Sequence, residues 1–248
     1  MEHFSNLLQH PPVSLDLGLE VSSHAAEPSL ECSTDPVTVD EVKKAVQLLK
    51  NNRAPGICKI TSEMLKAGGD NVIRRLMTYI INEVWYSENL PEDWTRGIIL
   101  PFLKRKGDKL VCSNHRGITV LFIPGKVFTH VLLGRSLPAI RSCRRPQQAG
   151  FMPNRSTIDQ ISALRLIIEK TREFRKGRDL YIAFIDLKAA FDSVNHAPSW
   201  AIMTCIGVPG KILRLFKKLY GDSQRCVCIN GKLPEWFNIN SGVRQGCT

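Results

Sequence analysis

Two aspartates close to an apolar segment are the residues whose types and spacing best suit chemistry. Asp186 lies near the end of Leu180–Leu187, LYIAFIDL, and Asp192 follows six residues later. A carboxylate at the end of a strand built for burial is costly unless something compensates its charge. A divalent cation would compensate it, and nucleotidyl transfer uses carboxylates that hold Mg²⁺. A cap on the next turn or a pair with Lys188 would also compensate it, so the spacing alone leaves both interpretations open.

The strands around these residues follow from local signals. Leu180–Leu187 is nearly continuous in β-prone apolar residues, which predicts a central strand covered on both faces. Gly97–Leu103 predicts a second strand, and Pro101 places it at an edge or at a strand end. Arg225–Ile239 has Asn230-Gly231 between two β-prone runs, which predicts a hairpin.

Helices are predicted by capping signals and apolar periodicity. Thr38 and Glu41 have capping-box spacing, so we expect a helix from residue 38 to about 50. Apolar residues repeat at three and four from Ile73 to Trp85, and we expect the strongest helix there, with Asp70 as its cap. Further helices are expected at about 125–136, 157–175 and 211–220.

Charge divides the chain into an acidic start and a basic body. The first 37 residues hold six acids and neither lysine nor arginine, and they are rich in proline and serine. We therefore expect a flexible linker over 1–37 and a folded domain over 38–248. The domain then holds all 34 basic residues and 17 of the 23 acids, a formal charge of +17. Such a charge favours nucleic acid as a partner, although an anionic membrane or a merely soluble basic surface would give the same balance.

Cysteine spacing and hydropathy exclude several classes of protein. The eight cysteines form no C-x-x-C pair and have no histidine at zinc-finger spacing, so neither a disulfide framework nor structural zinc is expected. The N-terminus lacks the layout of a secretory signal, and no apolar run approaches the ~20 residues that span a bilayer. These features predict a reduced intracellular protein, cytoplasmic or nuclear, without a membrane partner.

The segment from Phe184 to Val194, FIDLKAAFDSV, resembles motif A of reverse transcriptases in the form typical of LINE-type, non-LTR retrotransposons. The resemblance implies that Asp186 is the first of the catalytic aspartates, which together bind two Mg²⁺ ions. It also implies that Phe191 is the aromatic gate that excludes a ribose 2′-hydroxyl, and that Asp192 serves local structure. Without the resemblance Phe191 would be interpreted as a core phenylalanine, and the two roles are compatible.

Five other segments resemble further blocks of the family, in the family's order: Asn51–Gly69, Trp94–Asp108, Asn114–Thr119, Gln147–Gln160 and Ser241–Thr248. The resemblance implies that Lys104 and Arg116 hold the incoming triphosphate, because an ammonium and a guanidinium on connected strands suit phosphate oxygens. It implies that Arg155 contacts a template phosphate, and that Gln245 and Gly246 line the nucleotide and template site. Outside this family, the same residues would be interpreted as solvated turns and surface cations.

Three departures from the family pattern bear on geometry and activity. The family usually has A-P-G-P-D-G-I where this chain has Ala54–Ile60, APGICKI, so the Asp-Gly turn is missing. Met152 and Asn154 stand where arginine and glycine are common. The family's Asp-Asp motif, which supplies the remaining metal ligands, follows the Ser241–Thr248 block, and this sequence has no Asp-Asp pair. We therefore expect a fragment that is inactive alone and does not retain the Mg²⁺ ions.

The expected fold is α/β (α+β) and reverse-transcriptase-like, with an antiparallel sheet, packed helices, fingers at about 38–178 and a partial palm at about 179–248. The implied function is RNA-directed DNA synthesis. Its partners would be an RNA template, a DNA primer and deoxynucleoside triphosphates, with no obligate protein partner. The alternative is a non-catalytic nucleic-acid-binding protein derived from such an element. A phosphohydrolase that uses Asp186 and Asp192 is disfavoured, because the sequence offers no further acids or histidines that converge on them.

Overall fold

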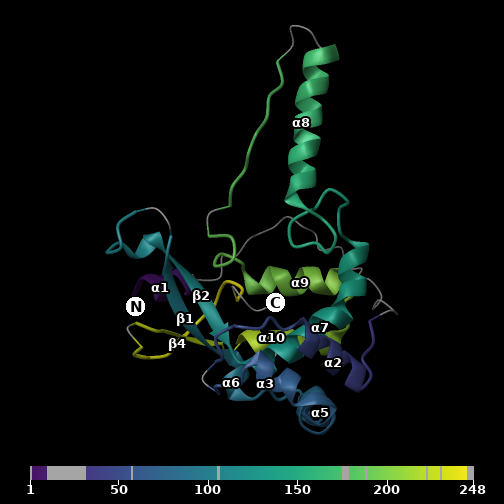
Figure 1. The fold of residues 1–248 in the computed structure, drawn as a ribbon, viewed down its shortest axis with the longest axis vertical. Helices are drawn as coiled ribbons and strands as arrows, with labels where there is room; N and C mark the ends of the chain where they lie inside the picture. Colours follow the sequence, from purple (N-terminus) through teal and green to yellow (C-terminus); the bar gives the residue numbers. More distant parts are fainter. Residues whose placement is uncertain are drawn as a thin grey trace. The chain divides into compact units, whose positions relative to one another are not determined.

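Two compact units make up the computed structural model, one of residues 1–140 with 189–248 and the other of 141–188. Figure 1 traces their elements along the sequence. The structure describes residues 2–9, 32–56, 58–104, 107–174, 179–187, 189–221, 223–229 and 231–244.

The larger unit combines helices with a four-stranded sheet (Figure 1), so the mixed α/β class expected from the sequence is confirmed. Its helical elements are α1 (Glu2–Leu8), α2 (Val39–Leu48), α3 (Ser62–Ala67), α4 (Gly69–Asn71), the π-helix η1 (Val72–Met77), α5 (Thr78–Ser87), α6 (Glu92–Thr95), the 3₁₀ turn η2 (Cys112–Asn114), α7 (Ile123–Ser142), α9 (His196–Cys205) and α10 (Gly210–Gly221). The helices expected at 38–50, 125–136 and 211–220 therefore correspond to α2, α7 and α10.

The sheet has the order β2-β1-β3-β4, with β1 at Arg96–Leu103, β2 at His115–Leu121, β3 at Gln224–Val227 and β4 at Phe237–Asn238. The pairs β1–β2 and β3–β4 are antiparallel, but β1 and β3 are parallel. The expected antiparallel sheet therefore also contains one parallel pair, which the sequence did not predict. The sequence signals for strands are local, whereas the β1–β3 pair joins segments more than a hundred residues apart.

Both local strand predictions in this sheet are confirmed. β1 pairs with β3 only over Arg96–Ile99, so Pro101 lies where β1 has β2 as its one neighbour and no second ladder needs its missing N–H. The hairpin between β3 and β4 carries a bridge between Ile229 and Lys232, and Gly231 has φ +76°, as a tight primed turn requires.

Residues 32–37, at the end of the linker expected over 1–37, make specific hydrogen bonds with the folded domain. The Asn82 side chain accepts a hydrogen bond from the Val37 N–H at 2.7 Å and donates one to the Val37 carbonyl at 2.9 Å. The Trp85 indole donates to the Thr34 carbonyl at 3.2 Å, and Cys32 is buried. Residues 32–37 are therefore part of the fold, and residues 10–31 lie outside the described residues.

The first helix also lies within the span 1–37 and packs on the sheet. In α1, Phe4 and Leu8 are buried against Ile99 of β1, Val227 of β3 and Ile239, in a second apolar cluster. A seven-residue helix is marginal in isolation, so this burial, rather than intrinsic propensity, stabilises α1. The acidic, Pro-rich composition of the following residues concealed this short amphipathic run.

The capping box that predicted α2 is present. The Thr38 hydroxyl accepts from the Glu41 N–H, while the Glu41 carboxylate accepts from the Thr38 N–H at 2.8 Å. The long helix expected near residues 70–87 is formed by α4, η1 and α5 in succession, with a π-helical stretch that periodicity did not predict. Asp70 is not its cap, because the Asp70 carboxylate lies inside α4 and pairs with Lys43 at 3.0 Å.

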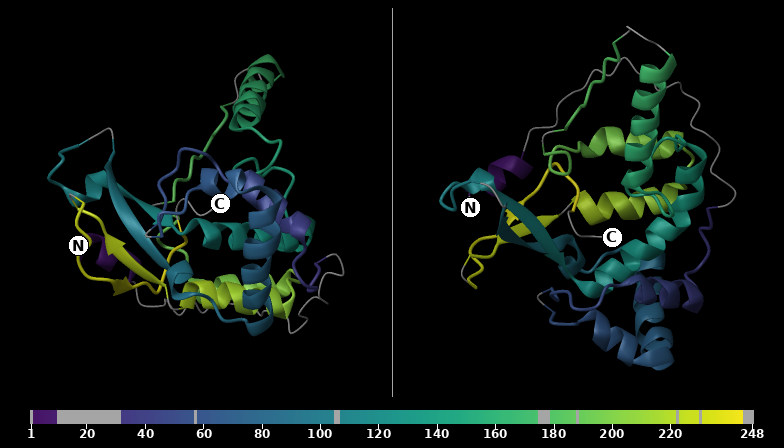
Figure 2. Two further views of the ribbon diagram at one scale, coloured as in Figure 1. Left: turned by 60° about the horizontal axis from the view of Figure 1, so that its bottom comes forward. Right: turned by 45° about the horizontal axis from the view of Figure 1, so that its top comes forward.

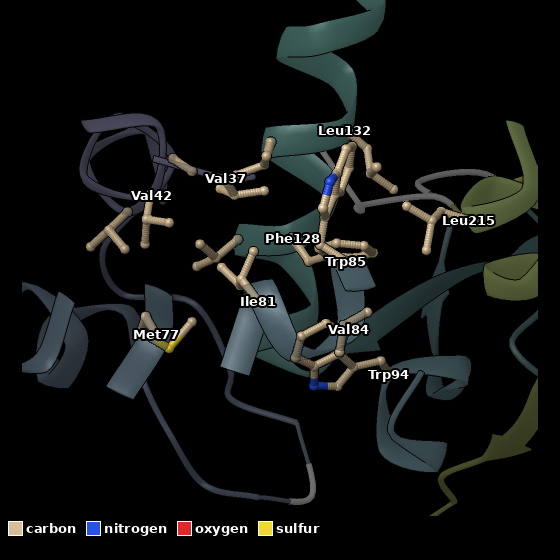
Figure 3. Packing of buried hydrophobic residues seen from close by; sticks show 14 of the residues in the cluster. Val37, Val42, Met77, Ile81, Val84, Trp85, Trp94, Phe128, Leu132 and Leu215 are labelled. Carbon is tan, nitrogen blue, oxygen red and sulfur yellow. The ribbon is translucent and has the colours of Figure 1, made fainter. Parts of the chain in front are cut away.

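The main core lies between the helices of the larger unit (Figure 3). Val42 of α2, Ile81 and Trp85 of α5, Phe128 of α7 and Leu215 of α10 are almost fully buried in it. The periodic apolar faces predicted for these helices therefore pack against one another. Helices α9 and α10 also lie side by side (Figure 2).

The missing Asp-Gly turn leaves a strained residue in this unit. Lys59 stands at the family's glycine position, has φ +58°, and donates its backbone N–H to the Gly56 carbonyl at 3.0 Å. The turn is thus kept, with a side chain where the left-handed conformation favours glycine. We expect Lys59→Gly to raise the free energy of unfolding by about 0.5–1 kcal/mol, because relief of strain exceeds the added entropy of the unfolded chain. Urea titration would measure this, and a loss of stability would contradict the assignment.

The smaller unit contains α8 (Thr157–Phe174) and an extended segment at 179–187. The helix expected at 157–175 is confirmed, but the central strand predicted at Leu180–Leu187 is wrong. Every side chain from 179 to 187 is exposed, and no described strand pairs with this segment. The apolar composition of this segment suits a buried strand. A strand forms, however, only where a neighbouring strand pairs with it.

Candidate nucleotide and nucleic-acid site

Lys104 and Arg116 lie on one face of the β1–β2 hairpin. The register pairs Phe102 with Arg116, and the Lys104 N–H donates to the Asn114 carbonyl at 2.7 Å. Directly paired residues share a face of an antiparallel sheet, as do alternate residues along a strand. Phe102, Lys104 and Arg116 therefore share a face, and all three side chains are exposed.

The two faces of this hairpin differ in how far they are buried. On one face Ile99 is buried, and a Cβ added to Gly117 would meet the Phe4 ring of α1 at 3.0 Å. On the face of the two cations, Phe102 keeps 51% of its surface exposed and Ile118 keeps 38%. The cations thus stand at one end of a partly open apolar surface, which suits a ligand with an apolar and an anionic part.

Phe191 belongs to a tight pairing between two distant segments. The Val243 N–H donates to the Phe191 carbonyl at 2.7 Å, and the Gly242 N–H donates to the Val194 carbonyl at 2.8 Å. Gly242 has φ +83°, and a Cβ there would lie 3.0 Å from the Asp192 Cα. A glycine is therefore required, and the segment after Asp186 is fixed against the first residues of the Ser241–Thr248 block.

The N-terminal helix α1 contacts the same loop, and no feature of the sequence indicated these contacts. The Leu8 carbonyl accepts hydrogen bonds from the backbone N–H groups of Asn240 at 3.1 Å and Ser241 at 3.3 Å, and from the Ser241 hydroxyl at 3.3 Å. The Gln9 side chain donates to the Asn238 carbonyl at 3.1 Å. The apolar spacing of Phe4 and Leu8 was the one signal that pointed to a buried helix.

A buried arginine also anchors this loop. Arg244 is 7% exposed; its guanidinium lies 5.0 Å from the Tyr220 ring centre and donates to the Trp94 carbonyl at 3.0 Å and the Ser223 hydroxyl at 2.9 Å. It also donates to the Leu219 carbonyl. An arginine next to glutamine would ordinarily be assigned to the surface, so no sequence signal predicted this anchor. Its neighbours Gln245 and Gly246 lie outside the described residues.

Asp192 experiences the charge of Lys104. Burial raises the pKa of the half-buried Asp192 carboxyl, and the positive charge of Lys104 offsets part of that rise. The end of β1 and the segment that follows Asp186 are therefore electrostatic neighbours. The expected structural role of Asp192 fits this position, because the Asp192 N–H also donates to the Ala189 carbonyl at 2.8 Å.

Asp186 and Arg155 lie in the smaller unit. Asp186 is exposed on the extended segment 179–187, and Arg155 is exposed in the loop before α8. Asn154 has φ +59°, so the family's glycine is replaced by the residue that best tolerates a left-handed backbone. Met152 accepts a hydrogen bond from the Arg144 guanidinium at 2.8 Å, so both departures in this block are accommodated.

Comparison with known protein families shows which family the chain belongs to. A family model described as reverse transcriptase (RNA-dependent DNA polymerase) matches residues 103–248, more than half of the chain. The chain belongs to the reverse transcriptase family. The matched span includes Arg116, Arg155, Asp186 and Phe191, each of which the sequence analysis had placed in a block of this family.

Relatives of this reverse transcriptase chain come from mobile elements. A transposon TX1 149 kDa protein of Xenopus laevis is 26% identical over 98% of the chain and 19% of the relative. An RNA-directed DNA polymerase from mobile element jockey of Drosophila funebris is 26% identical over 86% of the chain and 23% of the relative. A Pol polyprotein from an R2 retrotransposable element of Bradysia coprophila is also 26% identical, over 88% and 24%. The resemblance to non-LTR elements is thereby confirmed, and the chain spans about a fifth of these relatives.

Reverse transcriptases generally use Mg²⁺, so the carboxylates of this chain must be compared with what that ion requires. Among the described residues, no three His, Cys, Asp or Glu side chains gather into a group that could hold a metal. Asp186 is exposed, and burial raises the pKa of the Asp192 carboxyl, with the charge of Lys104 offsetting part of that rise. Mg²⁺ needs near-octahedral oxygen ligands, so this described set does not by itself fit two ions.

No helix in the described part of the chain is both long and apolar enough to cross a membrane.

Proposed function

We propose that this chain supplies the nucleotide-binding fingers and the first palm segment of an RNA-directed DNA polymerase. The observation that carries the proposal is the shared open face of Lys104 and Arg116 on the β1–β2 hairpin. Two fixed cations at the end of an apolar surface suit a triphosphate whose sugar and base extend over that surface. The fingers would span about 38–178 and the partial palm about 179–248.

In this proposal each candidate residue has one task. Lys104 and Arg116 bind the triphosphate of the incoming deoxynucleotide. Phe191, held by the Val243 N–H, excludes a ribose 2′-hydroxyl through its bulk. Arg155 contacts a phosphate of the RNA template. Asp186 is the chain's metal-binding carboxylate, and Gln245 with Gly246 would line the nucleotide and template site beyond the Arg244 anchor.

The partners that follow are an RNA template, a DNA primer and deoxynucleoside triphosphates. Synthesis on such partners would take place inside the cell, in the cytoplasm or the nucleus. A second candidate function, nucleic-acid binding without catalysis, is favoured by the absence of a metal-binding group among the described residues. The two functions share the basic fingers surface and differ in whether nucleotides are incorporated.

Binding to RNA or DNA should be strongly salt-dependent and largely independent of sequence. The 34 basic residues exceed the 23 acids, and each neutralised phosphate contributes a slope of about −0.7 to −0.9 to a log–log plot of affinity against salt. We expect Arg155→Ala to reduce the slope by about one such unit. Fluorescence anisotropy with a labelled oligonucleotide at several salt concentrations would measure the slope.

The matched control is Lys43→Ala. The Lys43 ammonium already pairs with Asp70 at 3.0 Å, so its removal should leave the salt slope unchanged. If the anisotropy of the labelled oligonucleotide does not change when folded parent protein is added, at low or at high salt, nucleic-acid binding is refuted, and with it both candidate functions.

A further inference from the structure

His196 is the first residue of α9, and its imidazole contacts the loop that follows β4. The Asn195 side chain caps α9 by accepting a hydrogen bond from the Ala197 N–H at 3.2 Å. The His196 Nε2 lies 2.7 Å from the Gly242 carbonyl oxygen. Because a carbonyl oxygen can only accept, Nε2 carries the proton and donates the hydrogen bond. The imidazole therefore holds one peptide group of the loop after β4.

The peptide group that His196 holds is the one that also binds Phe191. The Gly242 carbonyl and the Val243 N–H belong to a single planar peptide unit, so the two groups turn together. The Val243 N–H donates to the Phe191 carbonyl at 2.7 Å. A hydrogen bond from His196 to the Gly242 carbonyl therefore also determines whether the Val243 N–H points at Phe191.

The conformational freedom of Gly242 makes this restraint important. Gly242 has φ +83°, and glycine populates positive and negative φ about equally. A peptide unit that follows glycine can therefore take several orientations unless a partner selects one. The Gly242 N–H donates to the Val194 carbonyl at 2.8 Å, which restrains the peptide unit before Gly242. His196 restrains the peptide unit after it.

Two aromatic neighbours hold the His196 ring in place. Its centre lies 5.9 Å from that of Trp200, one turn later on α9, and 5.3 Å from that of Tyr220 on α10. The imidazole and the Tyr220 ring meet edge to face, at 69°, which is a favourable geometry for aromatic pairs. The Arg244 guanidinium lies 5.0 Å from the same Tyr220 ring. Tyr220 thus supports both the histidine that holds Gly242 and the arginine two residues after Gly242.

We propose that His196 is a positioning residue for the aromatic gate. By orienting the peptide unit of Gly242 and Val243, it sets the place of the Phe191 ring and so the preference for deoxyribose over ribose. The Phe191 side chain is 36% exposed, so packing encloses only part of it and its backbone contributes to its position. A shift of about 1 Å in such a group is enough to change the fit of a substrate. This inference rests on the proposed function, in which Phe191 excludes the 2′-hydroxyl.

The proposal is tested by isothermal titration of the full chain with dATP and with ATP, each in the presence of Mg²⁺. His196→Phe keeps an aromatic ring but cannot donate a hydrogen bond, whereas His196→Gln can donate from its amide. We expect His196→Phe to reduce the preference for dATP over ATP by about 2- to 12-fold, the factor that one hydrogen bond contributes. His196→Gln should retain the preference of the parent chain.

Hydrogen exchange followed by NMR is a second measurement, and it requires no nucleotide. The Val243 N–H should exchange about 2- to 12-fold faster in His196→Phe than in the parent. The Asn240 N–H, which donates to the Leu8 carbonyl at 3.1 Å, should exchange at the same rate in both. The matched control is His130→Phe on α7, which makes the same substitution outside the pairing of 191–196 with 240–244 and should change neither measurement.

An unchanged nucleotide preference in His196→Phe would overturn the positioning role. Equal acceleration of the Val243 and Asn240 amides would also overturn it, because the loop would then have loosened as a whole. A preference that is lost in His196→Gln but kept in His196→Phe would assign the effect to ring packing and contradict the proposal. A parent chain that binds ATP as tightly as dATP would overturn the inference together with the gate.

Failure of the proposed function has a different result. A parent chain that binds neither nucleotide would refute nucleotide binding itself. The exchange rate of the Val243 amide would then still decide whether His196 holds the peptide unit, and an unchanged rate in His196→Phe would refute that.

Discussion

Replacing Arg135 with alanine should lower the free energy of unfolding by about 3–5 kcal/mol. The guanidinium, 6% exposed, donates to both carboxylate oxygens of Glu41, at 2.7 and 2.8 Å. It also donates to the backbone carbonyls of Ser33, Asp35 and Pro36, and it lies 4.5 Å from the centre of the Trp85 ring. Removal would leave these acceptors without their donor and detach 32–37 from α7. Urea unfolding followed by tryptophan fluorescence would measure the loss.

The effect of Arg135 should depend on pH through Glu41. Burial alone would raise the pKa of Glu41, but hydrogen bonds from Arg135 and Thr38, together with the Arg135 charge, hold that pKa below its ordinary value. A carboxylate with a lowered folded-state pKa stabilises the fold above its unfolded-state pKa of about 4.3, and the contribution is lost as pH falls through the folded-state pKa. The stability difference between the parent and Arg135→Ala should therefore narrow below about pH 4.

Arg165→Ala is the control for this substitution. The Arg165–Glu169 pair, at 2.8 Å on the surface of α8, has both side chains more than half exposed. Such a pair contributes about 0.3–0.5 kcal/mol, so the control should change stability little. Equal losses in Arg135→Ala and Arg165→Ala would show that the buried network does not anchor the fold.

Replacing Asp186 with alanine should abolish nucleotide incorporation in a chimera that carries this chain's palm segment. In such a protein, residues 103–248 would replace the matching part of the jockey RNA-directed DNA polymerase. Loss of a residue that merely orients a metal ligand costs about 10- to 100-fold. Loss of the ligand itself should therefore cost more than about 100-fold, because the metals that activate the primer hydroxyl are no longer held. Primer extension on an RNA template would measure the rate.

The control in the chimera is Glu169→Ala, which removes an exposed acid of α8 that pairs with Arg165. It should leave the extension rate unchanged. If Asp186→Ala extends primers as fast as this control, Asp186 is not a metal ligand.

Elements with strong local signals could be predicted from the sequence. The capping box at Thr38 and the apolar period of α5 each specify one segment without reference to the rest of the chain. The β3–β4 hairpin was equally local, since the Asn-Gly step determines the turn. Local signals are informative here because capping and burial of one helical face involve neighbouring residues.

Features that depend on distant partners could not be predicted in this way. The parallel pairing of β1 with β3, the packing of Phe4 in α1 and the burial of Arg244 each need a segment far away in the sequence. The prediction of a strand at Leu180–Leu187 was wrong for the same reason, because the composition of a segment does not determine which strand pairs with it. Burial of an arginine is the least predictable of these, because it requires carbonyl acceptors from several elements.

The candidate site was identified through family resemblance more than through spacing. Lys104 and Arg116 are twelve residues apart, and only the register Phe102–Arg116 places them on one face. Asp186 carried a chemical signal of its own, as an acid in an apolar segment, but the structure gives it no neighbouring ligands among the described residues. No feature of the sequence predicted that the Leu8 carbonyl accepts hydrogen bonds from the Ser241 loop.

The most direct test of the account is equilibrium binding of a deoxynucleoside triphosphate to the chain itself, with Mg²⁺ present. Each charge-assisted hydrogen bond contributes about 1.5–3 kcal/mol, so Lys104→Ala and Arg116→Ala should each weaken binding by about 10- to 100-fold. Lys43→Ala, which removes a cation already paired with Asp70, should bind like the parent. The account predicts this pattern, and an affinity that is the same in the parent and in the Lys104→Ala/Arg116→Ala double variant would contradict it.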